Sequence, residues 1–346
     1  MLTRKTRSDK LCSPESGSRV RRGIMGSERT DVEFTSDGVV IRAWLYRPNV
    51  PNPPIIVMAH GLGGVKTMRL DAFAERFADA GYACLVFDYR HFGDSDGEPR
   101  QLLSVRRQLA DYDAAITYAK SLDGVDAARV VVWGSSFSGG HALTLASRHP
   151  GLAAAISQCP FTSGIASLGA LDPISSAKVT ARAIADLASS AVGRDPVTVG
   201  LTGHDHDAAL MTAPDAESGY VSLVPDGASF SNRVTARTGL AIPPYSPARK
   251  ASRIGIPTFV AICETDSVAP SGPTARAVQG NPHITAKIYP YGHFDIYVGD
   301  AFEDVVADEL AFLRDVVPVN PQRASVADAH AGRSPISSPA SDEVPS

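Results

Sequence analysis

The sequence has little cysteine, and no apolar run in it is long enough to cross a membrane. Four cysteines lie far apart in 346 residues, without a C-x-x-C pair. This spacing excludes a disulfide scaffold and a zinc site, and it favours reduced thiols in a cytoplasmic protein. No uninterrupted apolar segment approaches the roughly 18 residues of a membrane-spanning helix. We therefore expect neither disulfides nor a membrane partner.

Negative charge outnumbers positive charge outside the first 30 residues. The formal net charge is −4, whereas residues 1–30 carry eight Lys/Arg and three Asp/Glu. Without a global basic field we expect no nucleic-acid partner. Residues 1–30 have no apolar stretch and are predicted to form a disordered basic tail, with Met25 as an alternative start. Residues 318–346 are rich in Pro, Ser and Ala and are predicted to form a second disordered tail.

Between these tails, apolar segments of two kinds alternate. Residues 55–59 form a continuous apolar run, which is typical of a strand buried on both faces. Further strands are predicted at 83–87, 130–133, 153–157, 257–263 and 286–289. Helical periodicity marks 68–80, 105–119, 137–147 and 300–316. Residues 39–46 alternate between apolar and polar, as in an antiparallel edge hairpin. The order predicts an α/β fold, with a mostly parallel sheet and helices on both faces.

One long segment breaks this rhythm. Residues 161–250 contain Gly, Pro, Ser and short apolar patches, with one predicted helix at 175–191. An unstructured loop of this length is uncommon in a compact domain. We therefore predict a cap inserted over the carboxyl edge of the sheet, with residues 31–160 and 251–317 as the core.

A strand-to-helix turn around Ser136 contains the clearest chemical signal. The segment 130–140 reads VVVWGSSFSGG, so a buried strand passes into a helix through very small residues. A serine at such a turn adopts a strained backbone conformation that exposes its hydroxyl. Gly134 matches the first glycine of the G-x-S-x-G pattern, but Ser138 stands where the second is expected. We predict Ser136 as a nucleophile.

Other interpretations of this turn are weaker. A phosphate-binding loop is disfavoured because G-x-G-x-x-G and a Walker lysine are both absent. Ser135 and Ser138 are rival nucleophiles. Ser135 directly follows the strand and should point elsewhere, and Ser138 has no glycine two residues before it.

A serine hydroxyl needs a base, and the base needs an orienting acid. Among nine histidines, His293 follows the last strand and precedes the last helix, at the same sheet edge as Ser136. The loop after residues 257–263 offers Glu264 and Asp266. We favour Asp266, which lies further into the loop, and the order is then Ser, Asp, His.

An oxyanion also needs two preorganised N–H donors. The backbone amide of Phe137 directly follows the nucleophile. The loop after the first central strand reads HGLGG, and from it we choose the amide of Leu62.

With these residues the chain resembles the α/β-hydrolase superfamily over roughly residues 30–317. The resemblance includes the loop DYRHFGDS at 88–95 and Gly292 before His293. The turn at Ser136 is similar to that of the X-Pro dipeptidyl-peptidase and cocaine-esterase branch, and the rest resembles small bacterial esterases with an inserted cap. The resemblance implies an eight-stranded sheet, the roles given above for Ser136, Asp266 and His293, and no metal or organic cofactor. A serine at 136 argues against the dehalogenases and epoxide hydrolases of this fold, which use aspartate.

The composition of the predicted cap bears on the class of substrate. It has seven Lys/Arg and eight Asp/Glu, so no basic funnel for phosphate or coenzyme A is expected. Adjacent His and Asp at 203–207 are interpreted as polar surface rather than a metal site. Five apolar residues are candidates for lining a substrate pocket: Leu168, Leu171, Ile174, Met211 and Tyr220.

The sequence thus predicts a serine hydrolase that cleaves an ester or lactone of a moderately apolar small molecule. Amide, peptide or thioester hydrolysis and perhydrolysis on the same triad remain open, as does a ligand-binding protein without turnover. Homo-oligomerisation is also open, since fold alone settles neither partner nor reaction.

Overall fold

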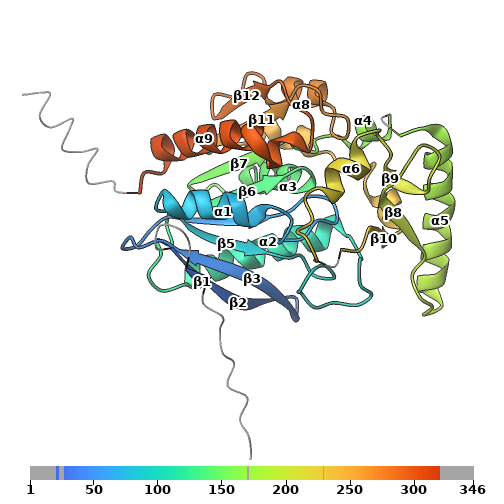
Figure 1. The fold of residues 1–346 in the computed structure, drawn as a ribbon, viewed down its shortest axis with the longest axis horizontal. Helices are drawn as coiled ribbons and strands as arrows, with labels where there is room; N and C mark the ends of the chain where they lie inside the picture. The colour runs from blue at the N-terminus through green and yellow to red at the C-terminus, as the bar shows by residue number, and fades with distance from the viewer. Residues whose placement is uncertain (1–20, 23–26, 170, 229, 320–346) are drawn as a thin grey trace, which may run out of the picture.

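The structure of the protein is a computed structural model that describes residues 21–22, 27–169, 171–228 and 230–319. Figure 1 shows a central twisted sheet covered by helices, with a smaller group of elements beside one end of it. Among the described residues no helix is long and apolar enough to span a membrane.

The central sheet has the order β1-β2-β3-β5-β4-β6-β7-β11-β12. Strands β5, β4, β6, β7, β11 and β12 run parallel, and β1, β2 and β3 are antiparallel to their neighbours. The strands are β1 (Arg21–Arg22), β2 (Glu28–Ser36), β3 (Val39–Arg47), β4 (Ile55–Ala59), β5 (Ala83–Phe87), β6 (Val130–Ser135), β7 (Ala154–Gln158), β11 (Thr258–Cys263) and β12 (Ile284–Tyr289). Eight longer strands and the two-residue β1 thus confirm the predicted mostly parallel sheet.

Helices cover both faces of this sheet (Figure 1). The chain moves one way across the sheet from β4 to β5 and the other way from β5 to β6, and right-handed crossovers then place α1 and α2 on opposite faces. Helix α9 packs beside α1, where Phe73 and Phe302 meet edge to face. The helices of the core are α1 (Leu70–Asp79), α2 (Val105–Ser121), α3 (Phe137–Ala146), α8 (Ser271–Val278) and α9 (Gly299–Val316).

The site is positioned at β4, where the order of the strands changes direction because β5 lies on one side of β4 and β6 on the other. The loops after β4 and β6 leave neighbouring strands at their carboxyl ends, where ligands bind in open α/β sheets. All five residues of β4 and all six of β6 are buried, so these loops stand on a rigid support.

The amino-terminal boundary was predicted wrongly. Strand β2 begins at Glu28, and Arg21 and Arg22 pair with Arg29 and Glu28, so part of 1–30 is ordered in the sheet. The hairpin of β2 and β3 lies at the expected edge, but β3 itself is internal because it also pairs with β5. Residues 1–20, 23–26 and 320–346 lie outside the described part of the chain, and their predicted disorder stays a prediction.

The segment 161–250, which follows β7 and precedes β11 in the sequence, contains a second, smaller sheet, and its last element packs on α3 and α8 of the core. Strands β8 (Thr198–Thr202), β9 (Ala209–Met211) and β10 (Arg233–Thr235) form a three-stranded sheet in the order β10-β8-β9. The remaining elements are α4 (Gly164–Leu168), α5 (Pro173–Ala191), α6 (Ala216–Val221), α7 (Thr238–Ala241) and the 3-10 helix η1 (Pro247–Arg253). We refer to residues 164–242 as the inserted segment.

Helix α5 of this segment begins two residues before its predicted start. Asp172 caps it, accepting hydrogen bonds from the amides of Ile174 and Ser175 at 2.9 and 3.0 Å. An aspartate at this position satisfies N–H groups that the first turn leaves unpaired.

Candidate active site

The turn between β6 and α3 places Ser136 in a strained conformation. Its φ and ψ are 57° and −118°, a region that residues with a side chain rarely adopt. Gly134 permits the turn, because a Cβ at this position would lie 2.1 Å from the carbonyl oxygen of Ser138. The strand and the helix therefore pass each other more closely than a larger residue allows, and the hydroxyl of Ser136 faces a pocket.

Ser136, His293 and Asp266 form a continuous hydrogen-bonded chain. Nε2 of His293 lies 2.9 Å from Oγ of Ser136, and Nδ1 lies 2.7 Å from Oδ2 of Asp266. The other carboxylate oxygen accepts the amides of Val268 and Ala269 at 2.9 and 2.6 Å. A carboxylate accepts at Nδ1–H, which leaves Nε2 to accept the proton of the serine hydroxyl.

The environment of His293 affects its proton affinity in two opposing ways. Burial disfavours the imidazolium, but the adjacent Asp266 carboxylate stabilises it, so the net pKa of His293 is raised well above its usual range. The side chains of His293 and Asp266 are each only 2% exposed. Little solvent is therefore available to screen this pair.

The rival groups considered in the sequence lie outside this hydrogen-bonded chain. The Ser135 hydroxyl contacts the Tyr297 hydroxyl, and the Ser138 hydroxyl donates to the carbonyl oxygen of His60 at 2.6 Å. Glu264 is exposed, and its side chain has no hydrogen-bond partner among the described residues.

His60 and His141 are buried structural histidines. Nε2 of His60 lies 3.0 Å from the carbonyl oxygen of Met68, and burial lowers the pKa of His60 to about 4. His141 contacts the hydroxyl of Tyr245 and the amide oxygen of Gln108, and burial lowers its pKa to about 3. Both rings are therefore neutral at ordinary pH, and their nitrogens contact groups other than Ser136.

Two backbone amides beside Ser136 have the character of an oxyanion hole. Leu62, Ser136 and Phe137 line the same pocket. Within the described chain, the N–H groups of Leu62 and Phe137 have no hydrogen-bond acceptor. The loop of Leu62 packs on the nucleophile, since a Cβ at Gly61 would lie 2.7 Å from Cβ of Ser136.

The loop of Leu62 is also anchored at its far end. The buried ammonium of Lys66 lies 2.6 Å from Asp88 and 2.5 Å from Asp94, and the amide of Lys66 donates to Asp88 at 2.7 Å. Asp88 and Asp94 belong to the segment DYRHFGDS after β5. This segment therefore fixes the loop that carries Leu62, a role that the sequence analysis did not assign.

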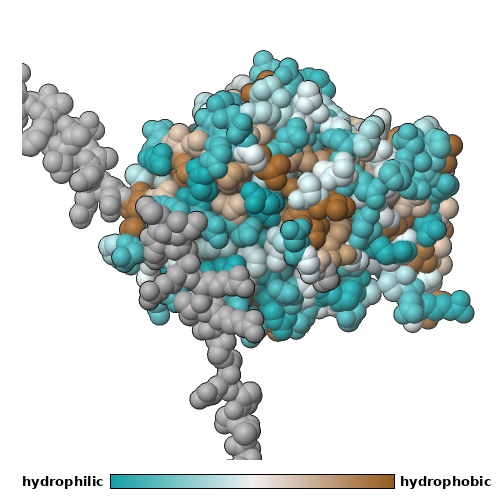
Figure 2. All heavy atoms as spheres, viewed as in Figure 1, coloured by the Kyte–Doolittle hydropathy of each residue, from teal (hydrophilic) through white to brown (hydrophobic). Residues whose placement is uncertain are grey.

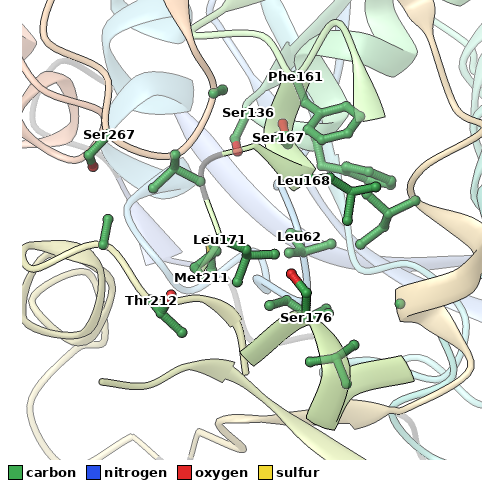
Figure 3. A pocket seen from close by; sticks show the side chains of 18 of the residues that line it. Leu62, Ser136, Phe161, Ser167, Leu168, Leu171, Ser176, Met211, Thr212 and Ser267 are labelled. Atoms are coloured by element: carbon green, nitrogen blue, oxygen red, sulfur yellow. The ribbon is translucent and has the colours of Figure 1, made fainter. Parts of the chain in front are cut away.

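An apolar pocket opens in front of Ser136, between the core and the inserted segment (Figure 3). Its volume is about 840 Å³ including the mouth, and none of its lining residues is charged. Figure 2 shows a hydrophobic area near the middle of the view, where α6 approaches the core. The apolar lining comprises Leu62, Phe137, Phe161, Leu168, Leu171, Val179, Leu210, Met211, Ala213, Ile242, Val268 and Ala269.

Three of the five predicted pocket residues line it, namely Leu168, Leu171 and Met211. The prediction was wrong for Ile174, which is 48% exposed because the first turn of α5 directs it outward. It was also wrong for Tyr220, whose ring packs against Phe230 and Phe294 instead. Val179, Leu210 and Ile242 were missed, because long-range packing decides which face of each element in this segment turns toward the core.

The His and Asp residues at 203–207 have partners on the surface. His204 lies 3.0 Å from Glu217, and His206 lies 3.0 Å from Asp172. The described residues contain no group of three or more His, Cys, Asp or Glu arranged to hold a metal ion. Cys84, Cys159 and Cys263 are buried and free, and Cys12 lies outside the described residues.

Comparison with known proteins relates this geometry to a family. Residues 51–298 match the family described as "Serine aminopeptidase, S33". The quorum-quenching protein AidA of Acinetobacter baumannii is 53% identical over 290 residues, which cover 84% of this chain and 95% of AidA. A thiohydrolase of Eupenicillium brefeldianum is 30% identical over 297 residues, covering 83% of this chain and 94% of that protein.

Solved structures give the same result for the fold. The crystal structure of the α/β-hydrolase GrgF from Penicillium sp. sh18 has a TM-score of 0.72 at 26% identity, covering 83% of this chain and 98% of GrgF. The predicted α/β-hydrolase fold and the prediction of a hydrolase acting on ester bonds are thereby confirmed. The chain belongs to the serine aminopeptidase S33 family of α/β-hydrolases.

Proposed function

We propose that the protein is a serine hydrolase that cleaves a carboxylic ester or lactone of a moderately apolar small molecule through an acyl-enzyme on Ser136. The observation that carries this proposal is the 2.9 Å contact between Ser136 Oγ and His293 Nε2 at the end of an uncharged pocket. A hydrogen-bonded base is what converts a serine hydroxyl into a nucleophile.

The proposed reaction has two halves, acylation and deacylation of Ser136, and each group of the site acts once in each half. Ser136 Oγ attacks the carbonyl carbon while its proton passes to Nε2 of His293. The amides of Leu62 and Phe137 donate to the oxyanion, and Asp266 stabilises the imidazolium through Nδ1–H. The imidazolium then protonates the leaving oxygen, and the alcohol departs.

Water completes the cycle. It attacks the acyl carbonyl and gives its proton to His293, and the second tetrahedral intermediate collapses when Ser136 Oγ leaves and regains that proton. In a lactone the leaving oxygen stays attached to the acyl chain, so the product is a single hydroxy acid.

The pocket supports an uncharged, largely apolar substrate. Burying an unpaired charge is costly, and this lining offers no ionic partner for one. The inserted segment supplies Leu168, Leu171, Val179, Leu210 and Met211, which supports its role as a cap over the site. We extend to this chain the role named for its relative AidA, so that the substrate is a small signal molecule with an ester or lactone bond.

Thioester hydrolysis is the second candidate. The Eupenicillium relative is described as a thiohydrolase and aligns over most of both chains. A thioester presents the same carbonyl to Ser136 and differs in its leaving group. A binding protein without turnover is disfavoured by the complete hydrogen-bonded chain from Ser136 to Asp266.

Hydrolysis of matched p-nitrophenyl esters, lactones, thioesters and amides by the wild type and by Ser136→Ala tests this proposal. We expect ester or lactone turnover in the wild type and a loss of several orders of magnitude in the variant, as in the about 10⁶-fold loss known for a comparable serine. Folded wild-type protein that cleaves only thioesters would support the second candidate. Equal turnover in wild type and Ser136→Ala would refute both.

A further inference from the structure

The residue that departs from the usual G-x-S-x-G pattern occupies a defined position behind the site. The side chain of Ser138 is fully buried in the first turn of α3. Its hydroxyl donates to the carbonyl oxygen of His60 at 2.6 Å. Because its only proton is used there, it accepts from the hydroxyl of Tyr89, which lies in contact with it. Ser138 therefore links the turn at Ser136 to the ends of β4 and β5.

The carbonyl of His60 lies just before the loop that carries the Leu62 amide. The oxygen of Gly61 and the N–H of Leu62 belong to one planar peptide and point in opposite directions. The amide of Gly64 donates to the Gly61 oxygen at 3.3 Å, so this turn directs the Leu62 N–H the other way. On its far side, Leu62 is held by Tyr220, which donates to the Leu62 carbonyl oxygen at 2.6 Å.

The two oxyanion donors come from segments that are distant in the sequence. The Phe137 amide belongs to the same helical turn as Ser138, whereas the Leu62 amide belongs to the loop after β4. Of the hydrogen bonds given above, the one from Ser138 to His60 is the contact that joins the turn directly to that loop. A glycine at 138 has no atom with which to make it.

We propose that Ser138 is a positioning residue that sets the separation of the Leu62 and Phe137 N–H groups, and hence the fit of the oxyanion hole to the transition state. This inference rests on the proposed serine hydrolase function. Loss of the bond misplaces a donor rather than removing it. The cost should therefore be smaller than the roughly 10²–10³-fold loss in kcat that follows removal of an oxyanion donor.

The structure offers a matched control for this position. Ser157 of β7 is also fully buried, and its hydroxyl donates to the carbonyl oxygen of Gly139 at 2.8 Å. Ser157→Ala therefore removes a hydrogen bond of the same type on the same helix, but one that does not reach the loop of Leu62. Both alanine variants should lose comparable thermal stability.

The test measures kcat, KM and inhibition by a trifluoromethyl ketone, which mimics the tetrahedral intermediate, on a p-nitrophenyl ester. For Ser138→Ala and Ser138→Gly we expect kcat to fall on the order of tenfold with KM little changed, and inhibitor affinity to fall by a similar factor. For Ser157→Ala we expect wild-type values of kcat and inhibitor affinity. If Ser138 had a merely structural role, Ser138→Ala and Ser157→Ala would lower the melting temperature equally. The kcat per folded molecule would then be unchanged in both variants.

Each outcome decides one of the two claims. Wild-type kcat and inhibitor affinity in folded Ser138→Ala would overturn the positioning role, even if Ser136→Ala is inactive. If wild-type protein fails to cleave any ester, the proposed function fails first. Should Ser138→Ala not fold, Ser138→Cys fills the position with a weaker donor, and it should show the same loss in kcat and inhibitor affinity; wild-type values in this variant would again overturn the role.

Discussion

Tyr220 of α6 donates its phenolic hydroxyl to the carbonyl oxygen of Leu62 at 2.6 Å, so the inserted segment is hydrogen-bonded directly to the loop of the candidate oxyanion hole. Tyr220 is only 4% exposed, and burial raises its pKa far above the usual range, so it remains a donor at all ordinary pH values. The segment that covers the pocket thus also contacts the backbone beside the nucleophile.

This contact predicts that Tyr220→Phe lowers kcat without closing the pocket. Phenylalanine keeps the ring packing against Phe230 and Phe294 but loses the hydrogen bond, which is worth about 1 kcal/mol and corresponds to about a fivefold change. Steady-state kinetics on a p-nitrophenyl ester measures the change. Tyr291→Phe is the control, since the Tyr291 hydroxyl contacts Asp304 away from the pocket. Equal effects of the two variants would contradict the prediction.

The pH dependence of activity should reflect the contact between Asp266 and His293. Only the neutral imidazole accepts the serine proton, and Asp266 raises the pKa of His293. Activity should therefore rise with pH through this raised pKa, on the alkaline side of the ordinary histidine value of 6.5. In Asp266→Asn the rise of activity with pH should occur at lower pH, and kcat should fall by a factor on the order of 10³–10⁴.

Glu264→Gln provides the control for this experiment. Glu264 lies on the same loop but is exposed, so its substitution should leave the pH profile unchanged. A profile of Asp266→Asn that superimposes on the wild type would show that Asp266 does not act on His293.

The acyl-chain preference should depend on Val179. A Cβ at Gly239 would lie 2.4 Å from Cγ1 of Val179, so these two residues pack together in the wall of the pocket. Val179→Ala should shift the optimum of a p-nitrophenyl ester series to longer chains, and Val179→Phe should shift it to shorter ones. Val192→Ala, at an exposed position after α5, should not change the profile. Opposite or absent shifts would place the acyl group elsewhere.

Stability should fall with rising pH because of Glu309. This side chain of α9 is fully buried, and its carboxyl accepts from Nε1 of Trp133 at 3.0 Å. Burial raises its pKa from 4.5 to about 8. The folded state then binds a proton that the unfolded state has lost, so the free energy of unfolding falls between these values, by at most about 1.4 kcal/mol per pH unit.

Glu309→Gln should remove this dependence while keeping an acceptor for Trp133. Urea unfolding at several pH values measures it, and above pH 8 the variant should be more stable than the wild type. Glu303→Gln is the control, because Glu303 lies exposed on the same helix. An identical pH slope in wild type and Glu309→Gln would exclude Glu309 as its source.

Sequence patterns predicted the part of the fold whose signal is local. Fully buried strands such as β4 are continuous apolar runs in the sequence. The small residues at 134–140 likewise indicated the turn that carries Ser136, and in the structure His293 lies beside this serine. The start of β2 was missed because its residues Glu28–Ser36 are mostly polar, as expected for a strand near the sheet edge, and resemble a charged tail.

The inserted segment was less predictable because long-range contacts decide its packing. The buried stripe of α5 contains Asp186 as well as Val179. Asp186 is accommodated by its ion pair with Arg237 at 2.6 Å and by the backbone amides of Val197 and Arg237, each at 2.9 Å. Because one buried residue of α5 is an aspartate, the buried face of this helix does not look apolar in the sequence. Ile174 of the same helix is exposed despite its apolar side chain. Similarly, the serine at 138 gave no sign that its partner would be the carbonyl of His60.

The acyl-enzyme on Ser136 is tested most directly by mass spectrometry of the protein labelled with a fluorophosphonate, a reagent for activated serines. We predict stoichiometric labelling of the wild type, a single modified residue at Ser136 after proteolysis, complete loss of ester hydrolysis in parallel, and no labelling of Ser136→Ala. An unlabelled wild type that hydrolyses esters, or a Ser136→Ala variant that is labelled and active, would contradict the account.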